Sequence, residues 1–143
     1  MKEIYLDHAA TTYLDPRVKK AMELYWELEY GNPSSLYRVG RHAKDALDGA
    51  RQNVAQILNC RPEEIIFTGG GTESINMAIF GTARMCQTKL GTGSKGHMIT
   101  SKIEHHAVLH SMEALGKEGF EVTYLDVDEY GLVNQDLFLY LFQ

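Results

Sequence analysis

The sequence is poor in cysteine, with two residues of this type, Cys60 and Cys86, in 143. The two cysteines lie far apart and show no Cys-x-x-Cys spacing, so the sequence does not indicate a disulfide framework. Free thiols without a pairing pattern favour a reducing compartment. We therefore expect a cytoplasmic protein.

Long apolar runs and clustered positive charges are also absent. No stretch approaches the roughly 18 apolar residues of a membrane span, and the N-terminal residues, MKEIYLDHAATT, lack the apolar core of a signal peptide. The net charge is −5 and the lysines and arginines are scattered singly, which argues against a nucleic-acid partner. The content of 44% hydrophobic and 23% charged residues is typical of a soluble globular domain.

Helical patterns come first along the chain and alternation follows. Asp15 and Pro16 predict a helix start, as N-cap and first helical residue, and 31–33 (Gly-Asn-Pro) predicts its end. Apolar residues from Leu36 to Ile57 keep helical spacing for about six turns. Short apolar segments then alternate with helical patterns, which predicts βαβ units and a parallel sheet. The predicted strands are 65–67, 98–100 and 120–125, and the predicted helices between them are 72–85 and 105–117.

The end of the sequence is apolar on all sides. Residues 137–142 read LFLYLF and are followed by Gln143. A helix without a polar face needs burial all round, and three strands are few for a parallel sheet covered on both faces. We expect the chain to be the front part of a larger domain, or a damaged copy of one. Residues 89–96, KLGTGSKG, predict a surface loop.

A run of three glycines, 69–71, separates the predicted strand 65–67 from the next helix. Glycine can take positive φ at no Cβ penalty, so the N–H groups of this turn can converge on one point at the helix start. Such a turn is suited to an anion such as phosphate, and a flexible turn that binds nothing remains equally open. No Lys-Ser or Lys-Thr follows the glycines, which excludes a Walker A motif. A second glycine pattern, Gly-x-Gly-x-x-Gly at 91–96, comes before a predicted strand, whereas a dinucleotide-binding fingerprint comes after one, so we interpret it as a loop.

A second group of candidate residues follows the predicted strand 98–100. Glu104, His105, His106 and His110 lie where ligands collect in parallel α/β sheets, beyond the carboxyl end of a strand. An imidazole there can stack on a flat ligand or carry a proton near neutral pH. His106 and His110 share a helix face but lack the His-Glu-x-x-His context of a zinc site, so we interpret them as surface residues and expect no metal. For His105 the residues alone leave a functional and a surface role open.

Several stretches together resemble the N-terminal portion of cysteine desulfurases of the nitrogen-fixation type, within the class V aminotransferases. These stretches keep the order of that family and run from Ile4 to about Asn134. They are YLDHAATT (5–12), YGNPSSLY (30–37), EEIIFTGGGTES (63–74), ITSKIEHHAV (99–108) and EGFEVTYLDVDEYGLV (118–133).

The resemblance implies pyridoxal 5′-phosphate as cofactor and assigns residues to it. By position, Gly71 and Thr72 hold the cofactor phosphate, and His105 stacks on the cofactor ring and takes part in proton transfer. Weaker candidates near the substrate are His8, Ala9, Thr11 and Asn32.

The resemblance also implies a fold, a reaction and partners. The fold is α/β, the N-terminal part of the class V aminotransferase fold, with a mostly parallel sheet flanked by helices. Residues 1–15 would pack near the active site, and residues 16–143 would form part of the large cofactor-binding domain of a homodimer. The family removes sulfur from L-cysteine, leaving alanine and an enzyme-bound persulfide. The sulfur then passes to an acceptor or scaffold protein for iron–sulfur clusters.

The residues that complete this chemistry in the family are missing from these 143. The family holds its cofactor on a lysine in a Ser-x-His-Lys stretch, and no such stretch occurs. Lys102 is the lysine nearest to the proposed site but lacks that context, and Cys60 and Cys86 are more typical of incidental thiols than of nucleophiles. We expect the chain to be inactive alone, and the unusual QDLFLYLFQ ending to reflect a truncation or frameshift. Two alternatives stay open: another class V enzyme, such as a selenocysteine lyase or an aminotransferase, and a non-catalytic remnant or binding module.

Overall fold

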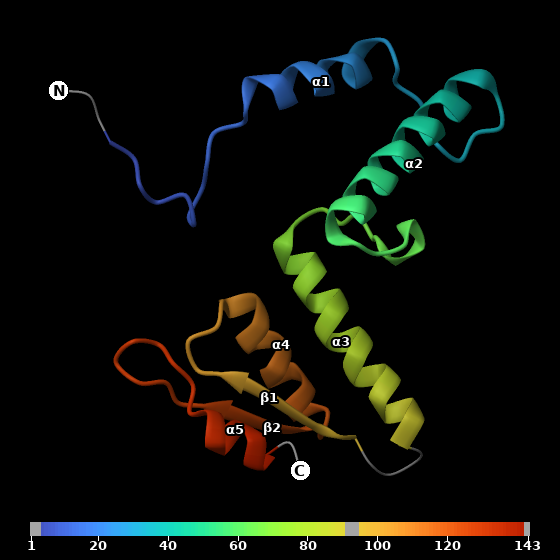
Figure 1. Cartoon of the computed structure of the whole chain (residues 1–143). Coiled ribbons are helices and arrows are strands. Elements are labelled where there is room, and N and C mark those ends of the chain that lie inside the picture. The colour runs from blue at the N-terminus through green and yellow to red at the C-terminus, as the bar shows by residue number, and fades with distance from the viewer. Residues whose placement is uncertain (1–3, 91–94, 142–143) are drawn as a thin grey trace. The chain divides into compact units, whose positions relative to one another are not determined.

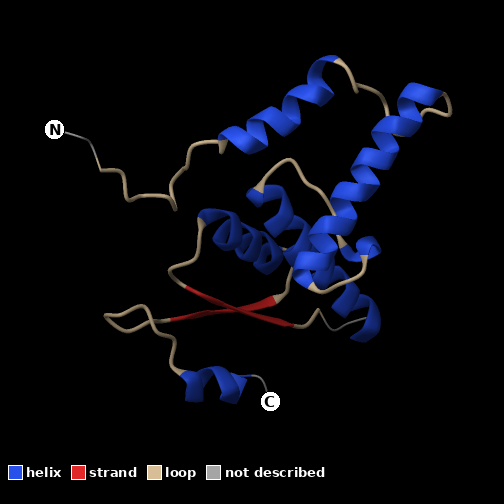
Figure 2. Cartoon of the chain, turned by 45° about the horizontal axis from the view of Figure 1, so that its top comes forward, coloured by secondary structure: helices blue, strands red, loops and turns tan. Residues whose placement is uncertain are grey.

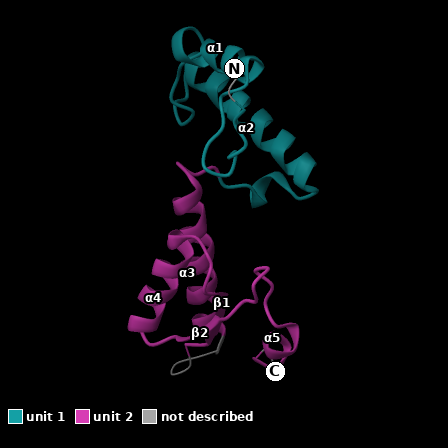
Figure 3. Ribbon diagram, turned by 90° about the vertical axis from the view of Figure 1, so that its left-hand side faces the viewer, with its two compact units in different colours: residues 1–66 teal, residues 67–143 magenta. Residues whose placement is uncertain are grey.

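A computed structural model describes residues 4–90 and 95–141 of the chain. Its elements follow in the order α1, α2, the short 3-10 helix η1, α3, β1, α4, β2 and α5 (Figure 1). The chain forms two compact units, Met1–Ile66 and Phe67–Gln143 (Figure 3). The glycine turn and His105 both belong to the second unit.

The first unit begins with α1, Pro16–Glu27, and the predicted start of this helix is confirmed. The side chain of Asp15 accepts a hydrogen bond of 2.8 Å from the backbone N–H of Arg17, and Pro16 is the first helical residue. The helix ends at Glu27, before the glycine and proline at 31 and 33. None of its residues is buried, so local capping rather than packing supports it within this unit.

Helix α2, Arg38–Leu58, confirms the long helical pattern. It ends at Asn59, which adopts a left-handed conformation with φ of 53°, a common helix terminator. Gly40 permits a close approach near the start, since a Cβ there would lie 2.6 Å from the carbonyl oxygen of Ser35. Helix η1, Pro62–Glu64, packs beside α2, and Arg51 of α2 donates to the carbonyl oxygen of Ile65.

The second unit is a βαβ arrangement, as predicted. It consists of α3 (Gly71–Leu90), β1 (His97–Ser101), α4 (His106–Lys117), β2 (Glu121–Leu125) and α5 (Gln135–Leu141). Strands β1 and β2 pair in parallel, with His97 opposite Glu121 and Ser101 opposite Leu125. Figure 2 shows α3 and α4 on one side of the strands and α5 on the other.

The core of the second unit joins α3 to α4 and β2. Ala83 of α3 and Leu115 of α4 are fully buried, and Phe120, just before β2, is 5% exposed. Partly buried side chains from α3 and both strands surround them, namely Ile79, Phe80, Met98 and Val122. Apolar contact therefore holds α3 and α4 together on one face of the strand pair.

Some predicted boundaries were wrong. Residues 65–67 form no strand in the described structure, because an extended segment becomes a strand only when a neighbour pairs with it. Lys89 and Leu90, predicted as loop, extend α3, and residues 91–94 of that predicted loop lie outside the described residues. The apolar run near the end forms α5, apart from Phe142, which also lies outside them.

The segment between β2 and α5 is a turn closed by one carboxylate. Asp128 Oδ1 accepts hydrogen bonds from the N–H groups of Tyr130 at 2.9 Å and Leu132 at 2.8 Å. Gly131 has φ of 82°, and Val133 forms an antiparallel bridge with Val127. Gly131 therefore lies at a turn, and Val133, two residues later, is extended.

Candidate functional site

The glycine turn is tied to the first turn of α3 by two side-chain contacts. Glu73 Oε2 accepts a hydrogen bond of 2.6 Å from the N–H of Gly69. The hydroxyl oxygens of Thr68 and Ser74 lie 2.5 Å apart. The turn is therefore held in one conformation by residues on both of its flanks.

The start of α3 presents backbone donors with no acceptor in the helix. The first α-helical hydrogen bond runs from the N–H of Ser74 to the carbonyl oxygen of Gly70, at 3.1 Å. The N–H groups of Gly71, Thr72 and Glu73 precede that bond, so they have no partner within the helix. Together with the positive end of the helix dipole, these donors favour an anion.

The glycines of the turn provide room rather than unusual torsion angles. Positive φ was expected to be available to them, but none of the three adopts it. A Cβ added at Gly70 or Gly71 would meet no heavy atom within 4 Å. The space beside the free amides is thus open to a ligand.

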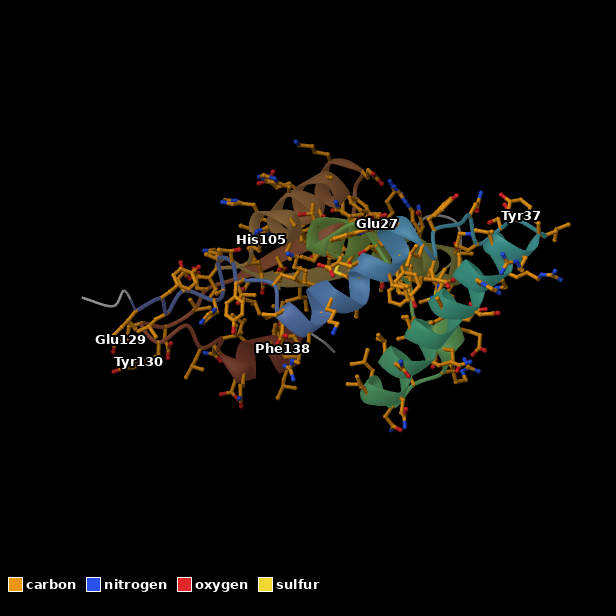
Figure 4. All side chains as sticks on the ribbon, turned by 90° about the horizontal axis from the view of Figure 1, so that it is seen from above. Glu27, Tyr37, His105, Glu129, Tyr130 and Phe138 are labelled. Atoms are coloured by element: carbon orange, nitrogen blue, oxygen red, sulfur yellow. The ribbon has the colours of Figure 1, made fainter. Side chains whose placement is uncertain are left out.

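His105 is the N-cap of α4 and follows β1 after a short connection. Its Nδ1 atom accepts a hydrogen bond of 3.1 Å from the N–H of Ala107. An imidazole that accepts at Nδ1 carries its proton on Nε2 when it is neutral. His105, labelled in Figure 4, is exposed, so Nε2 can exchange a proton with a ligand.

Helices α3 and α4 run in the same direction and begin at the same end of the second unit. Ser111 Oγ of α4 lies 2.5 Å from Asn76 Oδ1 of α3, a sequence separation of 35. Arg84 Nη2 pairs with Glu118 Oε2 at 2.6 Å, with nearly the same separation. Because the paired residues are separated by nearly the same number of positions in both contacts, the two helices advance together along their length. The N-terminus of α3 therefore lies level with that of α4. The views in Figures 1 and 3 agree with this arrangement.

This register brings the two predicted groups to one end of the helix pair. Gly71 and Thr72 begin α3, and His105 precedes α4. The arrangement combines donors for an anion with an exposed aromatic ring. A phosphorylated planar ligand matches these features, and the residues present fit pyridoxal phosphate.

The weaker candidates for substrate contact lie in the first unit. His8 Nδ1 is 3.2 Å from Thr12 Oγ1, and Ala9 and Thr11 belong to the same exposed segment. Asn32 Oδ1 accepts a 2.9 Å hydrogen bond from the N–H of Ser34. Since the glycine turn and His105 belong to the second unit, the assignment of these residues to the same site stays a prediction.

The other reactive side chains have local explanations. Lys102 Nζ pairs with Asp126 Oδ1 at 2.6 Å on the exposed surface. Cys60 and Cys86 are half-buried free thiols. His106 and His110 contact each other with ring centroids 5.5 Å apart. Across the described part of the chain, no three His, Cys, Asp or Glu side chains gather as metal ligands would.

Three residues of the second unit were missed by sequence reasoning, namely Glu73, Asn76 and Ser111. Glu73 follows the glycine turn in the first turn of a helix, where an acidic side chain commonly accepts from a preceding N–H group, and that pattern could have identified it. The contact of Asn76 with Ser111 depends on how two helices pack, and neither residue carries a local signal. Within residues 4–90 and 95–141, no helix combines the length and apolar character needed to cross a membrane.

Comparison with known proteins decides the family. The sequence matches the family Aminotransferase class-V over residues 4–142. The chain belongs to this family. A member named cysteine desulfurase IscS, from Dictyoglomus turgidum, is 48% identical over 135 residues, which is 94% of this chain and 33% of that protein. The protein of the same name from Methanosarcina thermophila is 48% identical over 136 residues, which is 94% of this chain and 32% of its own length.

Solved structures of the family agree with the fold. A NifS-like protein superposes with a TM-score of 0.88 at 36% identity, covering 98% of this chain and 37% of that one. A structure described as SspA in complex with cysteine gives a TM-score of 0.82 at 36% identity, covering 94% of this chain and 37% of the other. The expected class V fold and the resemblance to desulfurases are therefore confirmed. The chain spans about a third of the length of the curated relatives it matches.

Proposed function

We propose that this chain is the first part of a pyridoxal-phosphate-dependent cysteine desulfurase, with the cofactor held at the shared end of α3 and α4. The observation that carries the proposal is the register of the two helices, which places the open glycine turn level with His105. The names of the similar proteins support the substrate class, since they are called cysteine desulfurases and one similar structure is described with cysteine.

The phosphate would be held by the start of α3. The N–H groups of Gly71 and Thr72 lack helical acceptors, and the exposed Thr72 hydroxyl adds a donor beside them. The charge–dipole attraction amounts to about 0.3–1 kcal/mol at an exposed helix end. The rest of the affinity has to come from hydrogen bonds and from contacts with the ring.

The ring would be held by His105, whose Nδ1 is engaged by the N–H of Ala107. That bond orients the imidazole and leaves Nε2 to hold or move a proton next to the substrate. When bound, pyridoxal phosphate supplies an electron sink for negative charge that develops on the substrate. Residues 1–15 would pack near this site, and residues 16–143 would belong to the large domain. Contacts with the substrate would come from His8, Ala9, Thr11 and Asn32.

Residues 1–143 alone would not turn over cysteine, because they contain no Ser-x-His-Lys stretch. The protein in which they act would be a homodimer in the cytoplasm, and two unpaired thiols are consistent with that compartment. Its sulfur would pass to an acceptor or scaffold protein for iron–sulfur clusters.

A chimera tests this proposal directly. Residues 4–134 would replace the matching segment of the Dictyoglomus turgidum relative, and the product would be supplied with pyridoxal phosphate and L-cysteine. We expect one alanine for each sulfur released, and a rate lower by about a hundredfold or more in the His105→Ala chimera, since general acid–base groups contribute at least that much. Release of alanine from selenocysteine alone would indicate a selenocysteine lyase, and a folded chimera that binds no cofactor would indicate a non-catalytic segment.

A further inference from the structure

We propose that the hydrogen bond between Ser111 and Asn76 sets the spacing between the glycine turn and His105, so that both are positioning residues for the ligand. The inference rests on the proposed function, because it takes the phosphate and the ring to be parts of one molecule. Neither residue would touch that ligand. Each would act by fixing how α3 and α4 lie against each other.

The contact is a partly buried polar link between two helices. Ser111 is 3% exposed, Asn76 is half-buried, and their side-chain oxygens lie 2.5 Å apart. Ser111 Oγ also lies 2.7 Å from the carbonyl oxygen of Ala107, one turn earlier in α4. A serine hydroxyl has one proton, so both contacts are satisfied when Ser111 donates to Ala107 and the Asn76 amide turns its NH2 group towards Ser111. Loss of either side chain would remove this polar link between the two helices.

The other contacts between α3 and α4 are less able to fix a register. Ala83 and Leu115 are fully buried apolar side chains, and apolar contact has no preferred direction, so it tolerates sliding. The pair of Arg84 with Glu118 is 54% and 38% exposed, and exposed ion pairs constrain geometry weakly. The Ser111–Asn76 bond is directional and partly buried.

The position of this bond matches the proposed task. It lies about one and a half turns from the start of each helix, close to the end that carries the glycine turn and His105. The two helices run in the same direction, so their positive dipole ends lie side by side and repel each other. A directional bond near those ends opposes that repulsion. The Arg84–Glu118 pair lies near the opposite end.

Binding of two ligands to the 143-residue chain tests the inference. Inorganic phosphate probes the turn alone, and pyridoxine 5′-phosphate probes turn and ring together without an aldehyde that could react with lysine. For Ser111→Ala we expect affinity for pyridoxine 5′-phosphate to fall about fivefold, the equivalent of a lost stacking contact, and affinity for phosphate to change less than about twofold. Asn76→Leu should behave like Ser111→Ala, and so should Asn76→Asp, which has no N–H group to donate to the Ser111 hydroxyl.

Arg84→Ala is the matched control, because it breaks the other polar link between the same helices. It should leave the ratio of the two affinities unchanged. The proposal is overturned if Ser111→Ala lowers both affinities equally, or if Arg84→Ala shifts the ratio as much.

A distance measurement decides the point without a ligand. Spin labels at the exposed positions Met77 and His110 flank the bond, in a chain whose two cysteines are changed to serine. We expect one narrow distance distribution that broadens in Ser111→Ala and stays narrow in Arg84→Ala. A narrow distribution in Ser111→Ala would overturn the positioning role. If the unaltered chain binds neither ligand, the distance measurement still decides the positioning role, and the chimera decides the proposed function.

Discussion

Gly70→Ala separates the proposed anion site from the stability of the fold. Gly70 does not use positive φ, and a Cβ there would meet no heavy atom within 4 Å. Alanine caps a helix less well than glycine, by roughly 0.5 kcal/mol, and the lower entropy of the unfolded chain offsets about 0.4–1 kcal/mol. We therefore expect the free energy of unfolding to change by less than about 1 kcal/mol.

Anion binding should respond much more strongly than stability. A phosphate held by the N–H groups of Gly71 and Thr72 has to approach within about 2.9 Å of their nitrogen atoms. The new methyl group would take the room on that open side. Loss of one hydrogen bond to a charged group costs about 1.5–3 kcal/mol, which lowers phosphate affinity about tenfold to a hundredfold.

The assay is phosphate titration followed by ³¹P NMR, with urea unfolding of the same samples. Gly81→Ala is the matched control, because Gly81 lies in the same helix and a Cβ there also meets nothing within 4 Å. It should raise stability by up to about 1 kcal/mol and leave phosphate affinity unchanged. Unaltered phosphate affinity in Gly70→Ala would refute the anion site. A parallel loss of stability and affinity would show that the change acts through folding.

Four further outcomes are expected. His105→Phe keeps a flat ring and His105→Ala removes it, while both lose the cap on Ala107. In a fluorescence titration with pyridoxine 5′-phosphate, the alanine variant should bind about fivefold more weakly than the phenylalanine variant, and equal affinities would contradict stacking. Glu73→Gln removes a negative charge beside the turn but keeps an acceptor for the Gly69 N–H. Phosphate should therefore bind about threefold more tightly at low salt, as measured by ³¹P NMR, and this gain should be smaller at 0.5 M salt. Leu115→Ala leaves a cavity at a fully buried position. Urea unfolding should show a free energy of unfolding lower by about 2–5 kcal/mol, and a decrease below about 1 kcal/mol would contradict the place of Leu115 in the core. Hydrogen bonds from the side chain and then the backbone of Arg17 lower the pKa of Asp15 from 3.8. The stabilisation of α1 by Asp15 is therefore present at neutral pH and is lost as the pH falls below about 3.8 through the lowered pKa. Circular dichroism should detect this loss of helix in the unaltered chain and not in Asp15→Ala.

The elements that were predictable from sequence are those with local causes. The cap at Asp15, the long apolar face of α2 and the βαβ alternation each arise from residues close together in the chain, and each was found. The segment 65–67 has strand-like residues but forms no strand in the described structure, and strand pairing depends on residues distant in sequence. Local composition cannot supply that information.

The candidate site shows the same division. The glycine turn and His105 could be located from their positions after apolar segments, although the residues alone left their roles open. The resemblance to desulfurases supplied the roles. The link between Ser111 and Asn76 could not be predicted, because the register of two helices is set by packing of side chains that are 35 positions apart.

The parallel strand pair has a consequence for the behaviour of the chain in solution. Within the described residues β1 and β2 pair only with each other, so each strand keeps one edge whose N–H and C=O groups face no second strand. Such an edge is a template for any extended segment, including the same strand of another molecule. Self-association through these edges would grow with protein concentration. The working concentration thus becomes a variable that sets which species is measured.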